Sequence, residues 1–157
     1  MSSPPFEFLG PYRIGKPLGR GGMGTVFAAV HEKTKQPVAV KLISDNVADE
    51  SKFRRRFDAE IKSLQCLSHS GIVKIYGFGE EEGHLFYSME LVRGDSLQKV
   101  IKRDKRLDWQ TTIDVAIQIC AALKHAHDIG VIHRDLKPAN LVVDQNWQVK
   151  LVDFGIA

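Results

Sequence analysis

A glycine-rich hexapeptide lies between two runs of strand-forming residues near the start of the chain, and it limits the folds that the sequence can adopt. Residues 19–24 follow the spacing G-x-G-x-x-G. Glycines at this spacing let backbone amides approach phosphate oxygens, because no Cβ stands in the way. The β-branched Thr25 and Val26 come next, and the strand-like pattern continues to His31. The sequence therefore predicts a β-hairpin whose glycine turn can cover phosphates.

Two other phosphate-binding folds share part of this pattern, and the flanking residues argue against both. A dinucleotide-binding fold has a helix directly after its glycines, whereas here a strand and then Pro37 follow. The loop of P-loop enzymes ends in Gly-Lys-Ser or Gly-Lys-Thr, whereas here Gly24 precedes Thr25 and Val26. A flexible turn without a ligand is a third interpretation, since glycine clusters often mark turns. Residues further along the chain decide whether the turn binds phosphate.

Hydrophobic periodicity predicts an α+β fold with two lobes that divide near residues 92–95. Residues 1–11 contain three prolines and are interpreted as a flexible leader. The first lobe, about 12–92, is expected to be a five-stranded antiparallel sheet with one inserted helix. Its predicted strands are 12–18, 25–31, 37–43, 73–78 and 84–91, and its predicted helix is 51–68.

The second lobe, about 93–157, is expected to be mostly helical. We predict a short helix from about Ser96 and a long helix over 108–129, which Gly130 ends. Two short strands are expected at 141–143 and 149–152. The spacing of apolar residues predicts a buried face on the long helix, made of Ile113, Ala116, Ile117, Cys120 and Leu123.

The composition is that of an ordinary folded domain. The chain has 157 residues, 43% of them hydrophobic, and its net charge of +3 does not indicate a nucleic-acid or membrane surface. Cys66 and Cys120 form no CxxC pair, so we expect free thiols in a reducing cytoplasm. The sequence shows neither a signal peptide nor an apolar run long enough to span a membrane. A membrane anchor beyond residue 157 stays open.

A lysine and a glutamate lie at positions where burial would require a partner. Lys41 lies in an otherwise apolar predicted strand, where it either reaches solvent from an edge or points inward. Glu60 shares the apolar stripe of its predicted helix with Phe53 and Leu64. A carboxylate that is buried there is costly unless it is paired. We therefore hypothesise an ion pair between Lys41 and Glu60 at the mouth of the glycine turn; the alternative is that Glu60 extends to solvent.

The loop from His133 to Asn140 concentrates polar groups that suit phosphoryl transfer. It contains the carboxylate of Asp135, the ammonium of Lys137 and a terminal carboxamide within a few residues. The triplet Asp153-Phe154-Gly155 follows the next predicted strands. An amide oxygen and a carboxylate on neighbouring strand ends suit Mg²⁺, which prefers oxygen ligands.

Two other kinds of ligand fit the sequence less well. The basic residues Lys52, Arg54, Arg55 and Arg56 could form a nucleic-acid patch, but no aromatic side chains for base stacking are interleaved with them. We interpret them as a solvated helix face and expect no nucleic-acid partner. A zinc site could combine His125, His127, His133 and Asp135. Positions two apart on a helix point to different faces, so this site is disfavoured.

Together these motifs resemble the protein kinase family over about Tyr12 to Ala157. Residues 19–26 resemble the nucleotide-covering loop of kinases, and residues 38–41 resemble the strand that carries the phosphate-pairing lysine. Residues 133–140 resemble the catalytic loop, and residues 153–155 resemble the metal-binding triplet. Lys137 after Asp135-Leu136 is typical of the serine/threonine branch, and the form Gly-Arg-Gly-Gly-Met-Gly is typical of its bacterial members.

The resemblance implies a role for each matching residue. Asp135 would be the catalytic base, Lys137 would contact the transferring phosphoryl group, and Lys41 would hold the α- and β-phosphates of ATP. The implied catalytic residues are Asp135, Lys137, Asn140, Lys41 and Glu60, and the implied ligands of Mg²⁺, or of Mn²⁺ in its place, are Asn140 and Asp153. The implied nucleotide contacts are Leu18, Gly19, Arg20, Gly21, Gly22, Met23, Gly24, Thr25, Val26, Ala39, Lys41, Met89, Glu90, Val92 and Val142.

The resemblance covers the first part of a kinase domain, and the activation segment and the later helices are not among the 157 residues. In the family those parts bind the protein substrate and cover the long helix. We therefore expect an uncovered apolar face through which the chain can self-associate. Two functions follow: a protein serine/threonine kinase, or a truncated, inert ATP-binding or interaction module. We expect the 157 residues alone to bind Mg·ATP weakly and not to phosphorylate a protein substrate.

Overall fold

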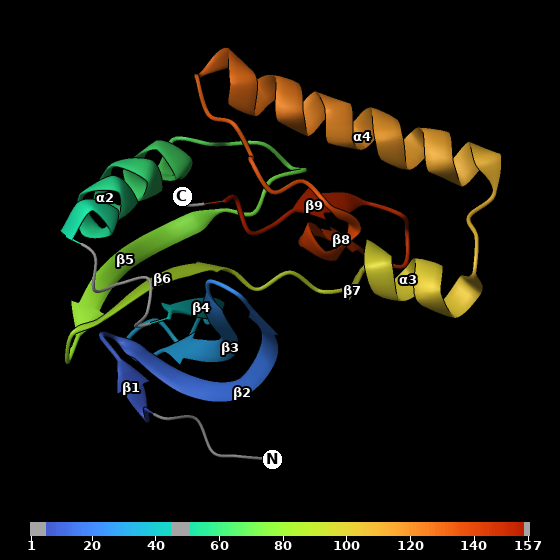
Figure 1. Ribbon diagram of the computed structural model, residues 1–157. Coiled ribbons are helices and arrows are strands. Elements are labelled where there is room, and N and C mark those ends of the chain that lie inside the picture. The colour runs from blue at the N-terminus through green and yellow to red at the C-terminus, as the bar shows by residue number, and fades with distance from the viewer. Residues whose placement is uncertain (1–5, 45–50, 156–157) are drawn as a thin grey trace. The chain divides into compact units, whose positions relative to one another are not determined.

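The computed structural model describes residues 6–44 and 51–155, and the chain forms two compact units (Figure 1). The first unit extends to Gln65 and resumes from Lys74 to Leu91. The second unit contains Cys66–Val73 and the chain from Val92 onward. The prediction that residues 12–92 form one uninterrupted lobe is therefore wrong for residues 66–73, which pack with the second unit.

The first unit is built on an antiparallel sheet with the strand order β1-β2-β3-β4-β6-β5. Consecutive strands pair with each other except β4 and β5, because β6 lies between these two in the sheet. The strands are β1 (Phe8–Leu9), β2 (Tyr12–Gly21), β3 (Gly24–His31), β4 (Pro37–Ile43), β5 (Ile75–Glu81) and β6 (His84–Glu90). Five of these six strands match the predicted runs within a few residues.

The additional strand, β1, corrects the interpretation of residues 1–11 as a flexible leader. Leu9 pairs with Tyr12 across a tight turn and is completely buried. Its side chain joins a cluster that includes Tyr12, Val40 and Phe86. The prolines suggested a loose segment, but the burial of one leucine fixes residues 8–9 against the sheet. Residues 1–5 lie outside the described part of the chain.

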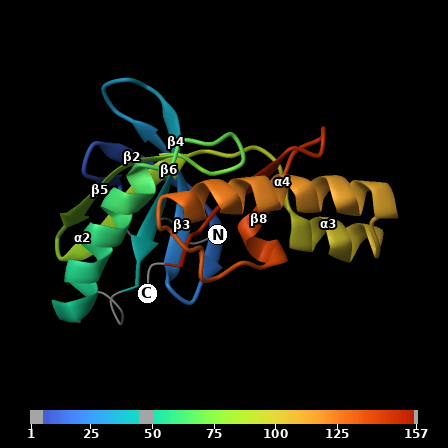
Figure 2. The ribbon, with the colours of Figure 1, turned by 90° about the horizontal axis from the view of Figure 1, so that it is seen from above.

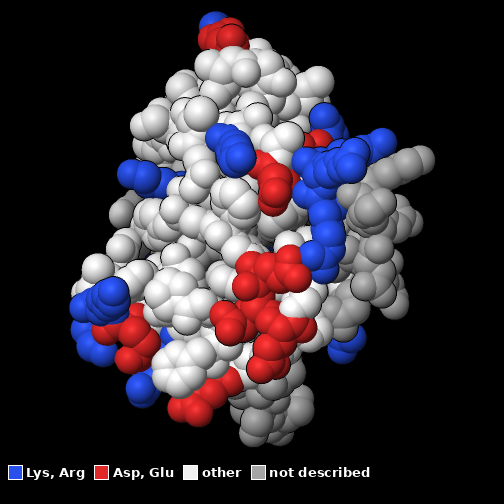
Figure 3. Space-filling model, turned by 90° about the vertical axis from the view of Figure 1, so that its left-hand side faces the viewer, with Lys and Arg blue, Asp and Glu red and all other residues white. Residues whose placement is uncertain are grey.

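Helix α2 (Ser51–Gln65) packs against β5 of the same unit (Figure 1). Its buried side chains recur at helical spacing and are Phe53, Phe57, Ile61 and Leu64. The ring of Phe57 meets Phe78 edge-on at 6.1 Å between centroids. On the outer side Arg54 Nη1 lies 2.6 Å from Glu80 Oε2. Figure 3 shows acidic and basic side chains next to each other on the face that carries α2 and the β5–β6 turn.

The second unit contains a three-stranded sheet and two helices. Its sheet has the order β7-β8-β9, with β7 (Asp95–Ser96), β8 (Leu141–Val143) and β9 (Val149–Leu151). The helices are α3 (Leu97–Asp104) and α4 (Trp109–Asp128), and a short 3-10 helix, η1 (Pro138–Asn140), precedes β8. Both α-helices start at side-chain caps: Ser96 accepts from the Lys99 amide and Asp108 accepts from the Thr111 amide.

Residues 66–73 are fixed to this unit by backbone hydrogen bonds to β9. The Val73 amide donates to the Leu151 carbonyl at 2.9 Å, and the Leu151 amide donates to the Gly71 carbonyl at 2.8 Å. A Cβ on Gly71 would lie 3.3 Å from the Ala122 side chain of α4. The segment is therefore held between the sheet and α4.

Helix α4 buries a different face from the predicted one. It is a single straight helix (Figure 2), and its buried side chains are Val115, Ala122 and Ala126. Of the predicted face, Ile113 is 49% exposed and Ile117 is 61% exposed. Cys120 is also exposed, as a free thiol. Apolar residues occur on both sides of this helix, so periodicity alone could not choose the buried side. Among the described residues no helix is long and apolar enough to cross a membrane.

Candidate active site

The glycine-rich segment forms the turn of the β2–β3 hairpin. Arg20 pairs with Thr25 and Gly21 pairs with Gly24, which leaves residues 22 and 23 as the turn. A Cβ added to Gly19, Gly21 or Gly22 would meet no atom within 4 Å. The backbone of this turn therefore borders open space and can approach a ligand closely, as the phosphate-covering interpretation requires.

Gly24 differs from the other glycines of the turn, because its backbone conformation and its close contact with β4 allow only glycine at this position. Its φ is +146°, and a Cβ there would lie 1.9 Å from the carbonyl oxygen of Leu42 on β4. No real Cβ approaches a carbonyl oxygen so closely. Gly24 thus allows the start of β3 to pair closely with the end of β4, and the remaining glycines leave room beside the turn.

Lys41 lies in the middle of the sheet rather than at an edge. It pairs with Val26 on β3 and with Tyr87 on β6, and only 4% of its surface is exposed. The alternative of an edge lysine that reaches solvent is therefore wrong. Burial of an ammonium is costly unless it is paired or hydrogen-bonded. Glu60 is half-buried on α2 of the same unit, and its pairing with Lys41 stays a prediction.

The residues predicted to contact adenine in the first unit lie on neighbouring strands. Ala39 pairs with Met89 across β4 and β6, and both side chains are buried. The Glu90 amide donates to the Lys74 carbonyl at 2.8 Å. That amide is therefore already used, so a contact from Glu90 to a base would have to come from its carbonyl group. Leu18 and Met23, near the glycine turn, are exposed.

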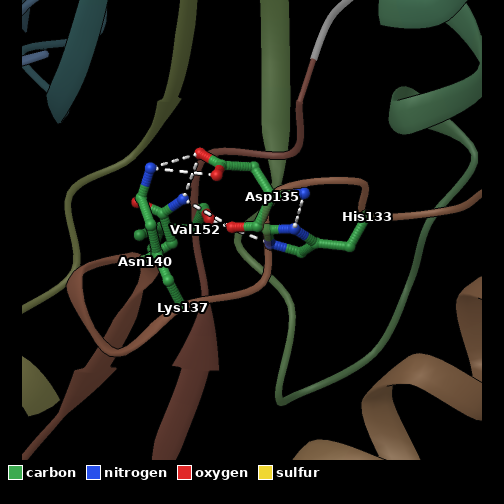
Figure 4. Close-up of polar contacts among 5 residues, drawn as sticks. All are labelled: His133, Asp135, Lys137, Asn140 and Val152. Carbon is green, nitrogen blue, oxygen red and sulfur yellow. Dashed lines mark hydrogen bonds and ion pairs between the residues drawn. The ribbon is translucent and has the colours of Figure 1, made fainter. Parts of the chain in front are cut away.

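Asp135 is the centre of a small polar cluster in the second unit (Figure 4). Lys137 Nζ donates to both of its carboxylate oxygens, at 2.9 and 2.7 Å, and Asn140 Nδ2 donates to Oδ2 at 2.9 Å. Chiefly because of the Lys137 hydrogen bond, with a smaller contribution from Asn140, the pKa of Asp135 lies below its usual value; burial opposes this shift. The carboxylate is therefore ionised at neutral pH. An exposed pair of this kind adds less than about 1 kcal/mol to stability, so its main effect is orientation.

His133 connects this cluster to the segment after β9 (Figure 4). Its Nδ1 accepts the Asp135 amide at 3.3 Å, so its Nε2, 3.2 Å from the Val152 carbonyl, is the donor. The ring also lies 4.4 Å from that of Phe154, between centroids. Burial lowers the pKa of His133, and the bond to Val152 opposes this shift. A neutral imidazole in one tautomer thus fixes the loop.

Asn140 and Asp153 flank the two strands of the β8–β9 hairpin, at the end where a backbone hydrogen bond joins them. Both hydrogens of the buried Asn140 amide point at Asp135, to its backbone oxygen and to Oδ2. Its Oδ1 is thereby directed away from Asp135 as an acceptor. The Val152 amide donates to the Asn140 carbonyl at 2.9 Å, which places Asp153 one residue beyond this link. A carboxamide oxygen and a carboxylate form the kind of donor set that Mg²⁺ prefers.

The other predicted residues fall in several places. Val142 lies on β8, half-buried, and Val92 begins the second unit's longer segment. The histidines do not gather into a metal site: His125 Nε2 accepts the Ser68 amide, while His133 faces Val152. Within residues 6–44 and 51–155, no group of three or more His, Cys, Asp or Glu side chains is placed to hold a metal ion.

One residue that holds the β8–β9 hairpin carried no signal in the sequence. Gln118 of α4 hydrogen-bonds to the β8–β9 turn through both ends of its amide. A glutamine on an amphipathic helix is usually a solvent-facing residue, and only the fold shows which segment it meets.

The sequence is similar to known proteins over nearly its whole length. A family model described as a protein kinase domain matches residues 12–157. Serine/threonine-protein kinase PknA of Mycobacterium tuberculosis is 39% identical over 153 residues, which covers 94% of this chain and 36% of PknA. PknH of Mycobacterium bovis is 40% identical over 151 residues, covering 96% of this chain and 25% of PknH. The chain thus spans about a third or less of the length of these relatives.

Solved structures agree with the fold. A double mutant of the Mycobacterium tuberculosis PknI kinase domain superposes with a TM-score of 0.87 at 30% identity, and the match covers 100% of this chain and 63% of that one. Rad53 1–466 in complex with AMP-PNP gives a TM-score of 0.82 at 31% identity, over 94% of this chain and 39% of that one. The α+β architecture predicted from periodicity is therefore confirmed.

Proposed function

The chain belongs to the protein kinase family, and we propose that its residues carry the ATP-binding and phosphoryl-transfer groups of a protein serine/threonine kinase. One observation carries the proposal: Lys137 and Asn140 both donate to the carboxylate of Asp135 (Figure 4). A single loop thus places a carboxylate base, an ammonium group and a carboxamide next to one another. The relatives named above as serine/threonine-protein kinases support the same reaction class.

In this proposal Asp135 orients the hydroxyl group of a serine or threonine and accepts its proton. Its lowered pKa keeps the carboxylate ionised, so the proton acceptor is present at neutral pH. Lys137 neutralises charge on the transferring phosphoryl group, from a position beside the base. Asn140 Oδ1 and the Asp153 carboxylate would hold Mg²⁺, which supplies charge neutralisation at the phosphate oxygens when it is bound. Positioning accounts for most of the expected rate.

The first unit would bind the nucleotide. The backbone of the glycine turn has open space beside it and would cover phosphate oxygens. The buried Lys41 would hold two of the phosphates, with Glu60 fixing its ammonium. Val26 and Ala39 would contact the adenine ring from neighbouring strands. Cys120 is an exposed free thiol, and we propose a cytoplasmic location because a reducing compartment keeps such a thiol free.

A second candidate is an interaction module that binds nucleotide without transferring phosphate. The exposed apolar side chains of α4, above all Ile113 and Ile117, favour it, since such surfaces are typical of protein contacts. The two candidates differ in whether the Asp135 cluster performs chemistry. They agree that ATP is bound.

Titration with ATP, followed by a phosphate-transfer assay on a generic serine/threonine protein substrate, tests the proposal. We expect Mg²⁺ to tighten ATP binding, Asp153→Asn to abolish that gain, and Lys41→Met to weaken binding with or without metal. Lys99→Met, at an exposed position on α3, is the control for loss of a positive charge. Transfer that falls by about 10²-fold or more in Asp135→Asn supports the kinase. Binding without transfer favours the interaction module, and absence of binding contradicts both.

A further inference from the structure

The side chain of Gln118 connects α4 to the turn of the β8–β9 hairpin at two points. Its Oε1 accepts the Val149 amide at 2.9 Å, and its Nε2 donates to the Trp147 carbonyl at 2.9 Å. The same Nε2 donates to the Asp114 carbonyl one helical turn back, at 3.4 Å. The orientation of the amide is fixed by these partners, because a flipped amide would place two donors against each other at Val149.

The turn that Gln118 holds is conformationally demanding. Trp147 has a φ of +58°, which is uncommon for a residue other than glycine. Asp144 organises the same turn from within, since its Oδ1 accepts the amides of Asn146 and Gln148. The hairpin therefore has a defined shape of its own, and Gln118 fixes that shape to the helix.

The opposite, open end of this hairpin carries both proposed metal ligands. Asn140 directly precedes β8, and Asp153 follows β9 by two residues. This end is attached to the loop through His133 Nε2 and the Val152 carbonyl, and the Gly155 amide donates to the His133 carbonyl. The strands of the hairpin are also held along their length, because β7 pairs with β8 and the Gly71 and Val73 backbones bond to Leu151 of β9. Gln118 adds an attachment at the turn, beyond the residues that these bonds join.

We propose that Gln118 is a positioning residue for the metal site: by clamping the far end of the β8–β9 hairpin to α4, it holds Asn140 and Asp153 in the mutual arrangement that metal-dependent nucleotide binding needs. The inference rests on the proposed function. Gln118 does not touch the ligands, so its effect passes through the hairpin, as the effect of an outer-shell residue passes through the ligands it supports.

Two measurements on the chain test the role. The first is amide hydrogen exchange without ligand in Gln118→Leu, which removes both bonds to the turn. We expect faster exchange at Val149, which loses its acceptor, and also at Val152 at the open end. The second is the ratio of ATP affinity with Mg²⁺ to ATP affinity without it. We expect this ratio to fall about tenfold, while metal-free ATP binding stays within the range of the control.

Gln118→Glu keeps an acceptor for Val149 but loses the donor to Trp147, so both effects should be intermediate. Gln110→Leu, at an exposed position on the same helix, is the matched control and should change neither measurement. If Val149 alone exchanges faster, or if ATP affinity falls equally with and without metal, Gln118 is structural and the inference is overturned. Wild-type ATP binding that is insensitive to Mg²⁺ would overturn the metal site itself, and with it this inference; a defect confined to the variants leaves the proposed function standing.

Discussion

At position 24 both the backbone and the surrounding space require glycine, although the sequence motif alone suggests only a ligand contact. The φ of +146° is strained for any residue with a Cβ, and the Leu42 carbonyl occupies the place where that atom would lie. We expect Gly24→Ala to lower the free energy of unfolding by about 1–3 kcal/mol from backbone strain, with an additional cost from the clash. Urea unfolding followed by circular dichroism measures this loss.

Gly21→Ala is the matched control, because a Cβ there meets nothing within 4 Å. It should change the free energy of unfolding by less than about 1 kcal/mol and weaken ATP binding instead. Equal destabilisation by the two substitutions would show that the turn, rather than the close pairing of β3 with β4, determines the requirement for glycine.

His133 makes the stability of the second unit depend on pH. Burial lowers its pKa in the folded chain, so the unfolded chain binds the proton more readily. Its contribution to stability is therefore complete above about pH 6.5, the ordinary value, and is lost as the pH falls through the lowered folded-state pKa. We expect the Tm to fall between about pH 7.5 and pH 5. In His133→Phe, which keeps the ring against Phe154, that fall should become shallower; an unchanged slope would contradict the assignment.

Among the helices, α2 depends on the few side chains that face the sheet. Ile61 is fully buried, whereas Asp58 on the same helix is exposed. We expect Ile61→Ala to cost about 2–5 kcal/mol of unfolding free energy, and Asp58→Ala to stay within about 0.5 kcal/mol. Chemical denaturation of the two variants distinguishes a helix that is held by burial from one that is held by its own propensity. Similar losses in both variants would argue against burial.

The elements could be predicted from the sequence where their signal is local. The stripe of Phe53 and Phe57 predicted α2, and the capping aspartate at 108 coincides with the start of α4. The buried side of α4 could not be predicted in this way, because Ile117 and Val115 both fit an apolar stripe and the segments that pack on the helix, among them β9 and residues 66–73, determine which side is covered. The same holds for β1, whose two residues carry no periodicity.

The residues of the candidate site could likewise be predicted where they lie close together in the sequence, and not where only the fold brings them together. The cluster of Asp135, Lys137 and Asn140 was predictable because a single loop contains all three residues. The central position of Lys41 depends on the strand order, in which β6 joins β4 from a distant part of the sequence. The support from Gln118 depends on the approach of a helix to a hairpin, and no spacing in the sequence encodes that contact.

Considered as a whole, the chain presents an apolar surface on α4. Ile113, Ile117 and Cys120 are exposed on this helix. We expect the 157-residue chain to self-associate at micromolar concentration, as exposed apolar patches promote. The double substitution Ile113→Glu and Ile117→Glu should shift it to monomer in sedimentation velocity experiments. The exposed pair Gln98→Glu and Lys102→Gln on α3 provides a control with the same change in net charge. Association that persists in the α4 variant would locate the contact elsewhere.

The burial of Leu9 has a consequence for how the limits of this domain are drawn. The family model begins at Tyr12, yet the side chain of Leu9 completes the cluster around Val40 and Phe86. The folding unit therefore begins before the first residue that the family model matches. Protein engineers who trim such a domain to the limits of the family model would remove a residue of its hydrophobic core and would expose the cluster around Val40 and Phe86 to water.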